Sequence, residues 1–173
     1  MEKIDFDILK QIYLHRPVYA DKFFIWVTQN TTLLTIVFIF IYLIYSFNQK
    51  NKSYKNVIFI ITSILSAAIV TNLLKIIIKR PRPYDIHSFI NIQHLDAGGY
   101  SFPSGHTTEV FALAMAMLLV TKSFKKVIPF YLWAILIAYT RMAFGVHYPL
   151  DILGGIIIGI LIPFIIYKIW SKK

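Results

Sequence analysis

The chain contains no cysteine, and only 15% of its 173 residues are charged. The absence of cysteine excludes a disulfide framework and a thiolate-bound metal site. The shortage of charge has a wider consequence, because 57% of the residues are hydrophobic, above the roughly 45–50% that is usual in soluble domains. Such a chain cannot cover its own surface with water-soluble groups. The lipid bilayer is therefore its expected solvent.

Acidic residues are also scarce: the chain has eight of them and 18 lysines and arginines, which gives a net charge of +10. An excess of positive charge can indicate nucleic-acid binding, but its distribution along this chain predicts a membrane topology and no nucleic-acid partner. Residues 1–20 mix both signs of charge without a continuous apolar stretch, so we expect no cleaved signal peptide. No repeat or flexible linker divides the chain. We expect a single membrane-embedded domain over residues 1–173.

Long apolar runs are what the sequence has in abundance. A helix that spans a membrane needs about 20 mostly apolar residues. Five runs fit this requirement, at 31–47, 55–78, 105–121, 127–143 and 150–170. They must be helical, because lipid offers no partner for free backbone groups. The predicted fold is an all-α integral membrane helix bundle with about five transmembrane helices, whose core covers residues 31–170.

The segment 1–28 has a different pattern, in which apolar and charged residues alternate. This pattern is typical of an amphipathic helix or helix pair that lies at the membrane interface. A short sixth span in this segment is the alternative. In the last apolar run, Gly155 and Gly159 form a face of small residues that suits close packing of helices.

The charges are segregated by the predicted topology. Five spans place segments 48–54, 122–126 and 168–173 on one side, which carries only lysines: Lys50, Lys52, Lys55, Lys122, Lys125, Lys126, Lys168, Lys172 and Lys173. All eight carboxylates lie on or near the other side. Because cytoplasmic loops are enriched in lysine and arginine, the lysine side and the C-terminus are predicted to be cytoplasmic. We expect a multi-pass protein of the inner or plasma membrane whose opposite side is periplasmic or extracellular.

Three polar blocks lie at the outward ends of the predicted spans, where polar residues are costly and need a reason. The first block runs from Lys75 to Pro83. Seven helical positions turn by about 700°, almost two whole turns, so Lys75 and Arg82 would share a face if the helix continued that far. Two cations directed at one place suit an anion. Lys79 and Arg80 are interpreted as ordinary basic residues that face the lipid headgroups.

The second block, Phe102–Thr107, opens the third span. A helix N-terminus offers free N–H groups and the positive end of the helix dipole, which together bind phosphate. Gly105 allows close approach of the backbone, Ser104 adds a hydroxyl and His106 adds a titratable proton. Taken alone, this block is equally compatible with a plain helix cap and an uninvolved histidine.

The third block places Arg141 at the end of the fourth span, His147 in the following turn and Asp151 in the first turn of the fifth span. A carboxylate four residues after a histidine can hold one ring N–H and leave the other nitrogen free to attack, as in catalytic triads. A surface Asp–His pair is the alternative. No further histidines or carboxylates have the spacing of metal ligands, so neither a metal nor a cofactor is expected.

Together the blocks read Lys75-x6-Arg82-Pro83, Pro103-Ser104-Gly105-His106 and Arg141-x5-His147-x3-Asp151. This order and spacing closely resemble the three-part signature of the phosphatidic acid phosphatase type 2 (lipid phosphate phosphatase) superfamily. The resemblance implies a catalytic set in which His147 attacks phosphorus and forms a phosphohistidine. Asp151 orients His147, and His106 protonates the leaving oxygen and then helps to activate water.

The resemblance also implies a phosphate-binding set without metal, formed by Lys75, Arg82, Arg141, Ser104 and the N–H of Gly105. Thr140 stands where the family usually has serine before the arginine, and it keeps the hydroxyl. Glu109, three residues after His106, is not explained by the resemblance. It could tune His106, bind a basic side chain or contact the substrate, and it has no place in the predicted catalytic set.

Two other classes of protein share part of this pattern. Vanadate-dependent haloperoxidases resemble the same motifs, because vanadate mimics phosphate, but they are larger and soluble. A transporter would spread its polar groups through the membrane midplane, whereas here they gather at one face. Among lipid phosphatases, a small chain with an outward site best resembles the bacterial undecaprenyl diphosphate phosphatases. Lipid A 1-phosphatase, phosphatidylglycerophosphate phosphatase and phosphatidic acid phosphatase are the alternatives, and the oligomeric state is not predicted.

Overall fold

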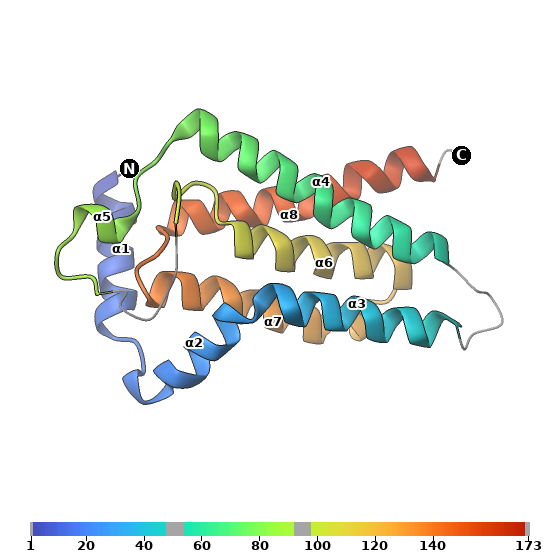
Figure 1. Ribbon diagram of the computed structural model, residues 1–173, viewed down its shortest axis with the longest axis horizontal. Coiled ribbons are helices and arrows are strands. Elements are labelled where there is room, and N and C mark those ends of the chain that lie inside the picture. The colour runs from blue at the N-terminus through green and yellow to red at the C-terminus, as the bar shows by residue number, and fades with distance from the viewer. Residues whose placement is uncertain (1, 48–53, 92–97, 172–173) are drawn as a thin grey trace.

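A computed structural model describes residues 2–47, 54–91 and 98–171, and all regular elements within these ranges are helical. Figure 1 shows the elements in chain order. They are α1 (Glu2–Leu14), the short 3-10 helix η1 (Val18–Ala20), α2 (Asp21–Gln29), α3 (Thr31–Phe47), α4 (Tyr54–Ile78), α5 (Pro83–Ile86), α6 (Gly105–Thr121), α7 (Phe124–Ala143) and α8 (Pro149–Trp170). The predicted all-α class is confirmed. The five predicted spans correspond to α3, α4, α6, α7 and α8.

Not every one of these helices has the length and composition of a membrane span. In the described part of the chain, two stretches do, Tyr54–Ile86 and Pro149–Trp170. A third is added if Val18–Gln29 and Thr31–Tyr45, which are bent by 61° at their junction, form one broken span. Helix α6 is apolar but shorter. The exact count of five spans therefore stays a prediction.

Helix α6 occupies the centre of the bundle, where it packs against α3, α4, α7 and α8 (Figure 1). Its sequence explains this position, because Ala112, Ala114 and Ala116 are fully buried and let neighbouring helices approach closely. The outer helices have the opposite character. Large apolar side chains of α3 and α4, among them Leu33 and Ile76, are more than half exposed, as suits a surface in contact with lipid.

Gly155 and Gly159 lie where α8 crosses α6, as the small-residue face predicted. A Cβ atom built at Gly155 would come within 2.8 Å of the carbonyl oxygen of Ser104. One built at Gly159 would come within 2.8 Å of the carbonyl oxygen of Thr108. Both distances are shorter than real Cβ contacts, so the helices can approach this closely only because both residues are glycine.

The N-terminal helices do not lie apart from the bundle. Helix α1 crosses one end of it beside α5 (Figure 1) and contacts α7 and α8, while α2 packs against α7. Leu9 and Tyr13 of α1 and Val27 of α2 are buried. The segment 1–28 therefore has one buried apolar face, in line with an amphipathic pattern. Its location at the membrane interface stays a prediction.

The start of α4, the connection from α6 to α7 and the end of α8 all lie at the end of the bundle away from α1 (Figure 1). Charged residues described in these segments are lysines only, namely Lys55, Lys122, Lys125, Lys126 and Lys168. The other lysines of the predicted set, Lys50, Lys52, Lys172 and Lys173, lie outside the described residues. These five lysines thus gather at one end of the bundle, and the three polar blocks gather at the other.

Candidate active site

His147 and Asp151 form the centre of the site, in and just after the tight turn that joins α7 to α8. His147 is 2% exposed and Asp151 is fully buried. The ring Nδ1 of His147 lies 3.5 Å from Oδ2 of Asp151 and 3.4 Å from the Ser101 hydroxyl. The turn itself depends on Gly145, which has a φ of +65° and where a Cβ would come within 2.5 Å of Ile90.

The second ring nitrogen of His147 identifies its tautomer. Nη1 of Arg82 lies 3.3 Å from Nε2 of His147. A guanidinium can only donate hydrogen bonds, so Nε2 must carry the lone pair and Nδ1 must carry the proton that faces Asp151. Burial, with the charges of Arg141 and Arg82, lowers the pKa of His147 to about 3, although Asp151 acts in the opposite direction. His147 is therefore neutral at ordinary pH, with Nε2 available to attack.

Arg82 is buried and held by backbone carbonyls on three sides. Nε donates to the carbonyl oxygen of Gly99 at 2.8 Å, Nη2 to Gly98 at 2.7 Å and Nη1 to Val146 at 3.2 Å. These bonds bring together the chain after α4, the loop before α6 and the turn before α8. The guanidinium is fixed beside Nε2 of His147 before any substrate arrives.

Lys75 and Arg141 complete a group of cations around the histidines. Nζ of Lys75, in the last turn of α4, donates to the carbonyl oxygen of Tyr100 at 2.5 Å. Arg141, 3% exposed, donates from Nη1 to the hydroxyl of Thr28 at 2.8 Å, and its Nε has no hydrogen-bond partner in the described part of the chain. Lys75, Arg82 and Arg141 all lie within electrostatic reach of His106. The structure thus brings the three predicted phosphate-binding cations to one place.

The N-terminus of α6 supplies the second histidine. Ser104 is buried, its N–H donates to the carbonyl oxygen of Asp151 at 3.0 Å, and its hydroxyl accepts a bond from Thr107 at 2.9 Å. A Cβ at Gly105 would meet no heavy atom within 4 Å. The first N–H groups of a helix have no partner inside it, so this end of α6 can offer N–H donors to a ligand.

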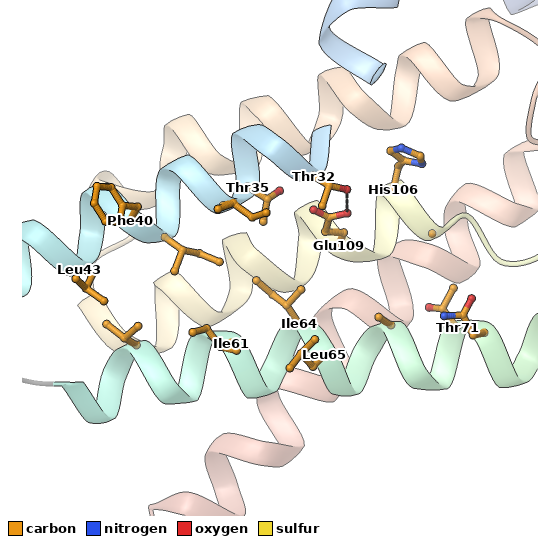
Figure 2. Close-up of a pocket in the computed structure, with 16 residues that line it drawn as sticks. Thr32, Thr35, Phe40, Leu43, Ile61, Ile64, Leu65, Thr71, His106 and Glu109 are labelled. Atoms are coloured by element: carbon orange, nitrogen blue, oxygen red, sulfur yellow. Dashed lines mark hydrogen bonds between the residues drawn. The ribbon is translucent and has the colours of Figure 1, made fainter. Parts of the chain in front are cut away.

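A groove of about 660 Å³ runs from this point between α3 and α4 over α6. Figure 2 shows His106 at one end of it and apolar side chains such as Phe40, Leu43 and Ile61 along its length. Polar side chains also line the groove near His106, and among them the hydroxyl of Thr32 donates to Glu109 at 2.9 Å. Glu109, which the motifs left unexplained, therefore lines the groove one helical turn beyond His106.

Several residues of the site were not found by reading the sequence. Ser101 donates to Oδ2 of Asp151 in a short hydrogen bond, and the N–H of Tyr148 donates to the same oxygen at 2.8 Å. Arg80 forms an ion pair with Oδ1 of Asp151 at 2.7 Å and a second one with Asp5. The interpretation of Arg80 as a headgroup-facing residue is therefore wrong, because both ends of its guanidinium are engaged inside the protein. The only available signal was its place between the motif positions Lys75 and Arg82.

The described residues contain no group of three or more histidines and carboxylates placed to hold a metal ion. The ring of His147 faces the carboxylate of Asp151 and the hydroxyl of Ser101 on one side and the guanidinium of Arg82 on the other. The cation on the Nε2 side suits an anionic ligand. The fold and the site together define an apolar helix bundle with a cluster of histidines and cations at one end.

The sequence profile of the PAP2 superfamily matches residues 56–173, and the chain belongs to this superfamily. It is 26% identical over 169 residues to the undecaprenyl-diphosphatase BcrC of Bacillus subtilis. This alignment covers 95% of this chain and 83% of that protein. It is 30% identical over 166 residues to the lipid A 4'-phosphatase of Porphyromonas gingivalis, with 87% and 66% covered. These relatives are named as lipid phosphatases or diphosphatases, and this chain is a hydrolase of that kind.

Among solved structures, the chain resembles the first transmembrane PAP2 type phosphatidylglycerolphosphate phosphatase from Bacillus subtilis. The TM-score is 0.81 over 99% of this chain and 86% of that one, at 23% identity. A likeness at this level of identity shows the fold alone. With the apolar helices described above, it identifies this chain as a membrane protein.

Proposed function

We propose that this protein hydrolyses a membrane lipid phosphate or diphosphate through a phosphohistidine on Nε2 of His147. The observation that carries the proposal is the arrangement of that ring, with Nδ1 turned to Asp151 and Nε2 turned to the cation Arg82. A neutral imidazole with its lone pair among cations is suited to attack a phosphorus atom whose oxygens those cations bind.

The reaction needs two displacements at phosphorus. In the first, Nε2 of His147 forms a bond to phosphorus while the bond to the lipid oxygen breaks, and that oxygen takes a proton from His106. Asp151 stabilises the positive charge that His147 acquires. In the second displacement, a water molecule gives a proton to His106 while the water oxygen forms a bond to phosphorus. The P–N bond to His147 breaks, phosphate leaves, and His147 is neutral again.

The phosphate oxygens are assigned to Lys75, Arg82, Arg141, Ser104 and the N–H of Gly105. Electrostatic stabilisation of this kind accounts for most of phosphoryl-transfer catalysis. Positive charges fixed by hydrogen bonds, such as those of Arg82 to three carbonyl groups, need little reorganisation when charge moves onto the oxygens. We therefore propose metal-independent catalysis.

We take undecaprenyl diphosphate as the substrate, with undecaprenyl phosphate as the lipid product. Two observations support this choice. The relative that shares 95% of this chain's length is named an undecaprenyl-diphosphatase, and the groove that ends at His106 is lined mainly by apolar side chains that suit a hydrocarbon chain. The name of the second relative makes lipid A phosphate the main alternative.

The test is release of phosphate by the purified protein from a panel of undecaprenyl diphosphate, lipid A, phosphatidylglycerophosphate and phosphatidic acid. Undecaprenyl diphosphate should give the highest kcat/KM. EDTA should leave the rate unchanged, and vanadate, which adopts the geometry of a phosphoryl group in transfer, should inhibit. Loss of activity with EDTA and its rescue by Mg²⁺ would contradict the mechanism, whereas a preference for another lipid would change only the substrate.

We also propose that the site faces the periplasm or the outside and that the C-terminus is cytoplasmic. The lysines at the end of the bundle away from the site support this orientation. A reporter fused after Lys173 should behave as a cytoplasmic protein, and a cysteine placed at exposed Ser88 should react with a membrane-impermeant maleimide on intact cells. The chain has no cysteine of its own to interfere. The reverse pattern would overturn the orientation and weaken the choice of substrate.

A further inference from the structure

Arg80 connects the catalytic carboxylate to the N-terminal helix. One oxygen of Asp151, Oδ2, faces His147, while the other, Oδ1, accepts a hydrogen bond from Nη1 of Arg80 at 2.7 Å. The second amino group of the same guanidinium, Nη2, forms an ion pair with Oδ2 of Asp5 in α1. Arg80 thus bridges two carboxylates that are far apart in the sequence, and only one of them lies in a motif.

Asp5 is fixed at both of its oxygens. It is 3% exposed, and its Oδ1 accepts the N–H of Leu150, the second residue of α8, at 2.9 Å. An acceptor for this N–H is normally the side chain of the residue that precedes a helix. At the start of α8 this N–H is bound by a carboxylate from α1. A negative charge at this point also complements the dipole of α8.

The bridge matters for the charge on Asp151. An arginine paired with Asp151 alone would draw its negative charge away from His147. Asp5 shares the guanidinium, so the group of three carries one net negative charge, which remains available to His147.

The bridge also fixes the orientation of the carboxylate. The guanidinium of Arg80 lies 4.0 Å from the centre of the Tyr148 ring, which limits its rotation. Because Oδ1 of Asp151 accepts a hydrogen bond from this guanidinium, Oδ2 is directed toward His147, Ser101 and the N–H of Tyr148. Removal of one end of the bridge frees Arg80 to move and Asp151 to rotate with it.

We propose that Asp5 is a positioning residue of the phosphatase: through Arg80 it fixes the orientation and preserves the negative charge of Asp151, and so supports His147 when its ring becomes positively charged. The inference rests on the proposed role of His147 as nucleophile. It gives α1 a part in catalysis although no residue of α1 belongs to the three motifs.

The main test compares Asp5→Asn with Asp7→Asn in the purified full chain, with p-nitrophenyl phosphate as substrate. The Asp5 variant keeps the size of the side chain and the oxygen that accepts the N–H of Leu150, but it loses the charge that faces Arg80. Asp7 is an exposed residue of the same helix, so its variant controls for the change in charge. Loss of an outer partner of a catalytic group typically costs about 10–100-fold. We expect a fall of that size in kcat for Asp5→Asn, with KM within about twofold, because substrate binding is not affected.

A second comparison tests whether Asp5 acts through Arg80. Residues that act through one network have non-additive effects. In an Arg80→Gln background the bridge is already broken, so Asp5→Asn should then lower kcat by less than about twofold. A structural role of Asp5 in the packing of α1 predicts instead the same further loss in both backgrounds.

The outcomes separate this inference from the proposed function. If kcat of Asp5→Asn equals that of Asp7→Asn, or if its loss is the same in the Arg80→Gln background, the role of Asp5 is wrong and that of His147 is untouched. If His147→Ala keeps its activity, the proposed function itself fails. Should Asp5→Asn not fold, Arg80→Lys gives the same test, since a lysine keeps the charge but cannot bridge both carboxylates. An unchanged kcat in that variant would also overturn the inference.

Discussion

The two histidines of the site lie in opposite kinds of surroundings. His147 is 2% exposed, and both of its ring nitrogens face fixed partners, Asp151 and Arg82. His106 stands at the mouth of an apolar groove (Figure 2), and its ring makes no hydrogen bond in the part of the chain that the structure describes. One ring is held before substrate arrives, and the other is left open at the place where the lipid would enter.

The difference matches the two tasks that we assign to them. A nucleophile must approach phosphorus along one line, so a fixed ring with a defined tautomer is an advantage. A general acid must meet the leaving oxygen of a bound substrate and then a water molecule. An open position suits that exchange. Three experiments test whether the two rings have these different roles.

The largest effect is expected for His147→Ala, which removes the atom that bonds to phosphorus. Turnover should fall by more than about 10⁴-fold, and no phosphoenzyme should form. The measurement is trapping of labelled phosphate on the chain, which should be acid-labile and base-stable in the unaltered protein. His15→Ala is a matched control, because His15 is exposed and lies in the connection between α1 and η1. Labelled phosphate that remains on His147→Ala would show that another residue is the nucleophile.

A smaller and substrate-dependent effect is expected for His106→Ala. The nucleophile remains, but the leaving oxygen is no longer protonated, and general acid catalysis is typically worth about 10²–10⁴-fold. The loss should be of this size for an alkyl phosphate, whose leaving group is poor. It should be much smaller for p-nitrophenyl phosphate, whose leaving oxygen needs little help. Equal losses on both substrates would exclude the assigned role.

The turnover of Asp151→Asn should lie between those of the two histidine variants, because the substitution weakens the orientation of His147 without removing either ring.

The smallest effect concerns stability and depends on the burial of His147. Its folded pKa of about 3 is below the unfolded value of about 6.5, so the unfolded chain binds more protons between these two pH values. Stability therefore falls as the pH drops through this window, by about 2 kcal/mol from His147 alone between pH 7 and pH 5.

Thermal unfolding in detergent at these two pH values gives the measurement. The decrease in Tm on acidification should be smaller in His147→Asn than in the unaltered chain, because asparagine does not titrate. The His15→Ala control should behave as the unaltered chain does. An identical decrease in all three proteins would show that His147 is not held neutral by the fold.

The sequence was sufficient for the class of fold, because the signals are local. Apolar runs predicted α3, α4, α6, α7 and α8 close to their observed bounds, and the spacing of Gly155 and Gly159 predicted close packing of α8. The bend of 61° between the α2 region and α3 has no such local signal. It follows from contacts of α2 with α7, which join residues more than a hundred positions apart.

The candidate site shows the same division. The structure places the cations and histidines of the three motifs near one another, although α4 ends at Ile78 and Lys75 and Arg82 do not share a helix. Asp5, Ser101 and Thr28 were missed, because each enters the site only through contacts with residues that are distant in the sequence. Asp5 reaches Leu150 across 145 positions, and Thr28 reaches Arg141 across 113. An aspartate in an amphipathic helix has the same pattern in the sequence whether it faces water or a buried arginine, so only the packed structure separates these cases.

The close contact between α6 and α8 at Gly155 and Gly159 fixes the distance between two parts of the candidate site. Ser104 and Gly105 begin α6, while His147 and Asp151 lie in the turn and the first residues that lead into α8, so the two halves of the site are carried by different helices. The carbonyl oxygen of Ser104 would lie 2.8 Å from a Cβ at Gly155. One added methyl group would have to push the helices apart by tenths of an ångström. Displacement of reacting groups by about 1 Å can cost 10²-fold in rate. In the mechanism that we propose, Gly155 would therefore help to keep the start of α6 aligned with His147, although it lies at the helix contact and has no chemical role.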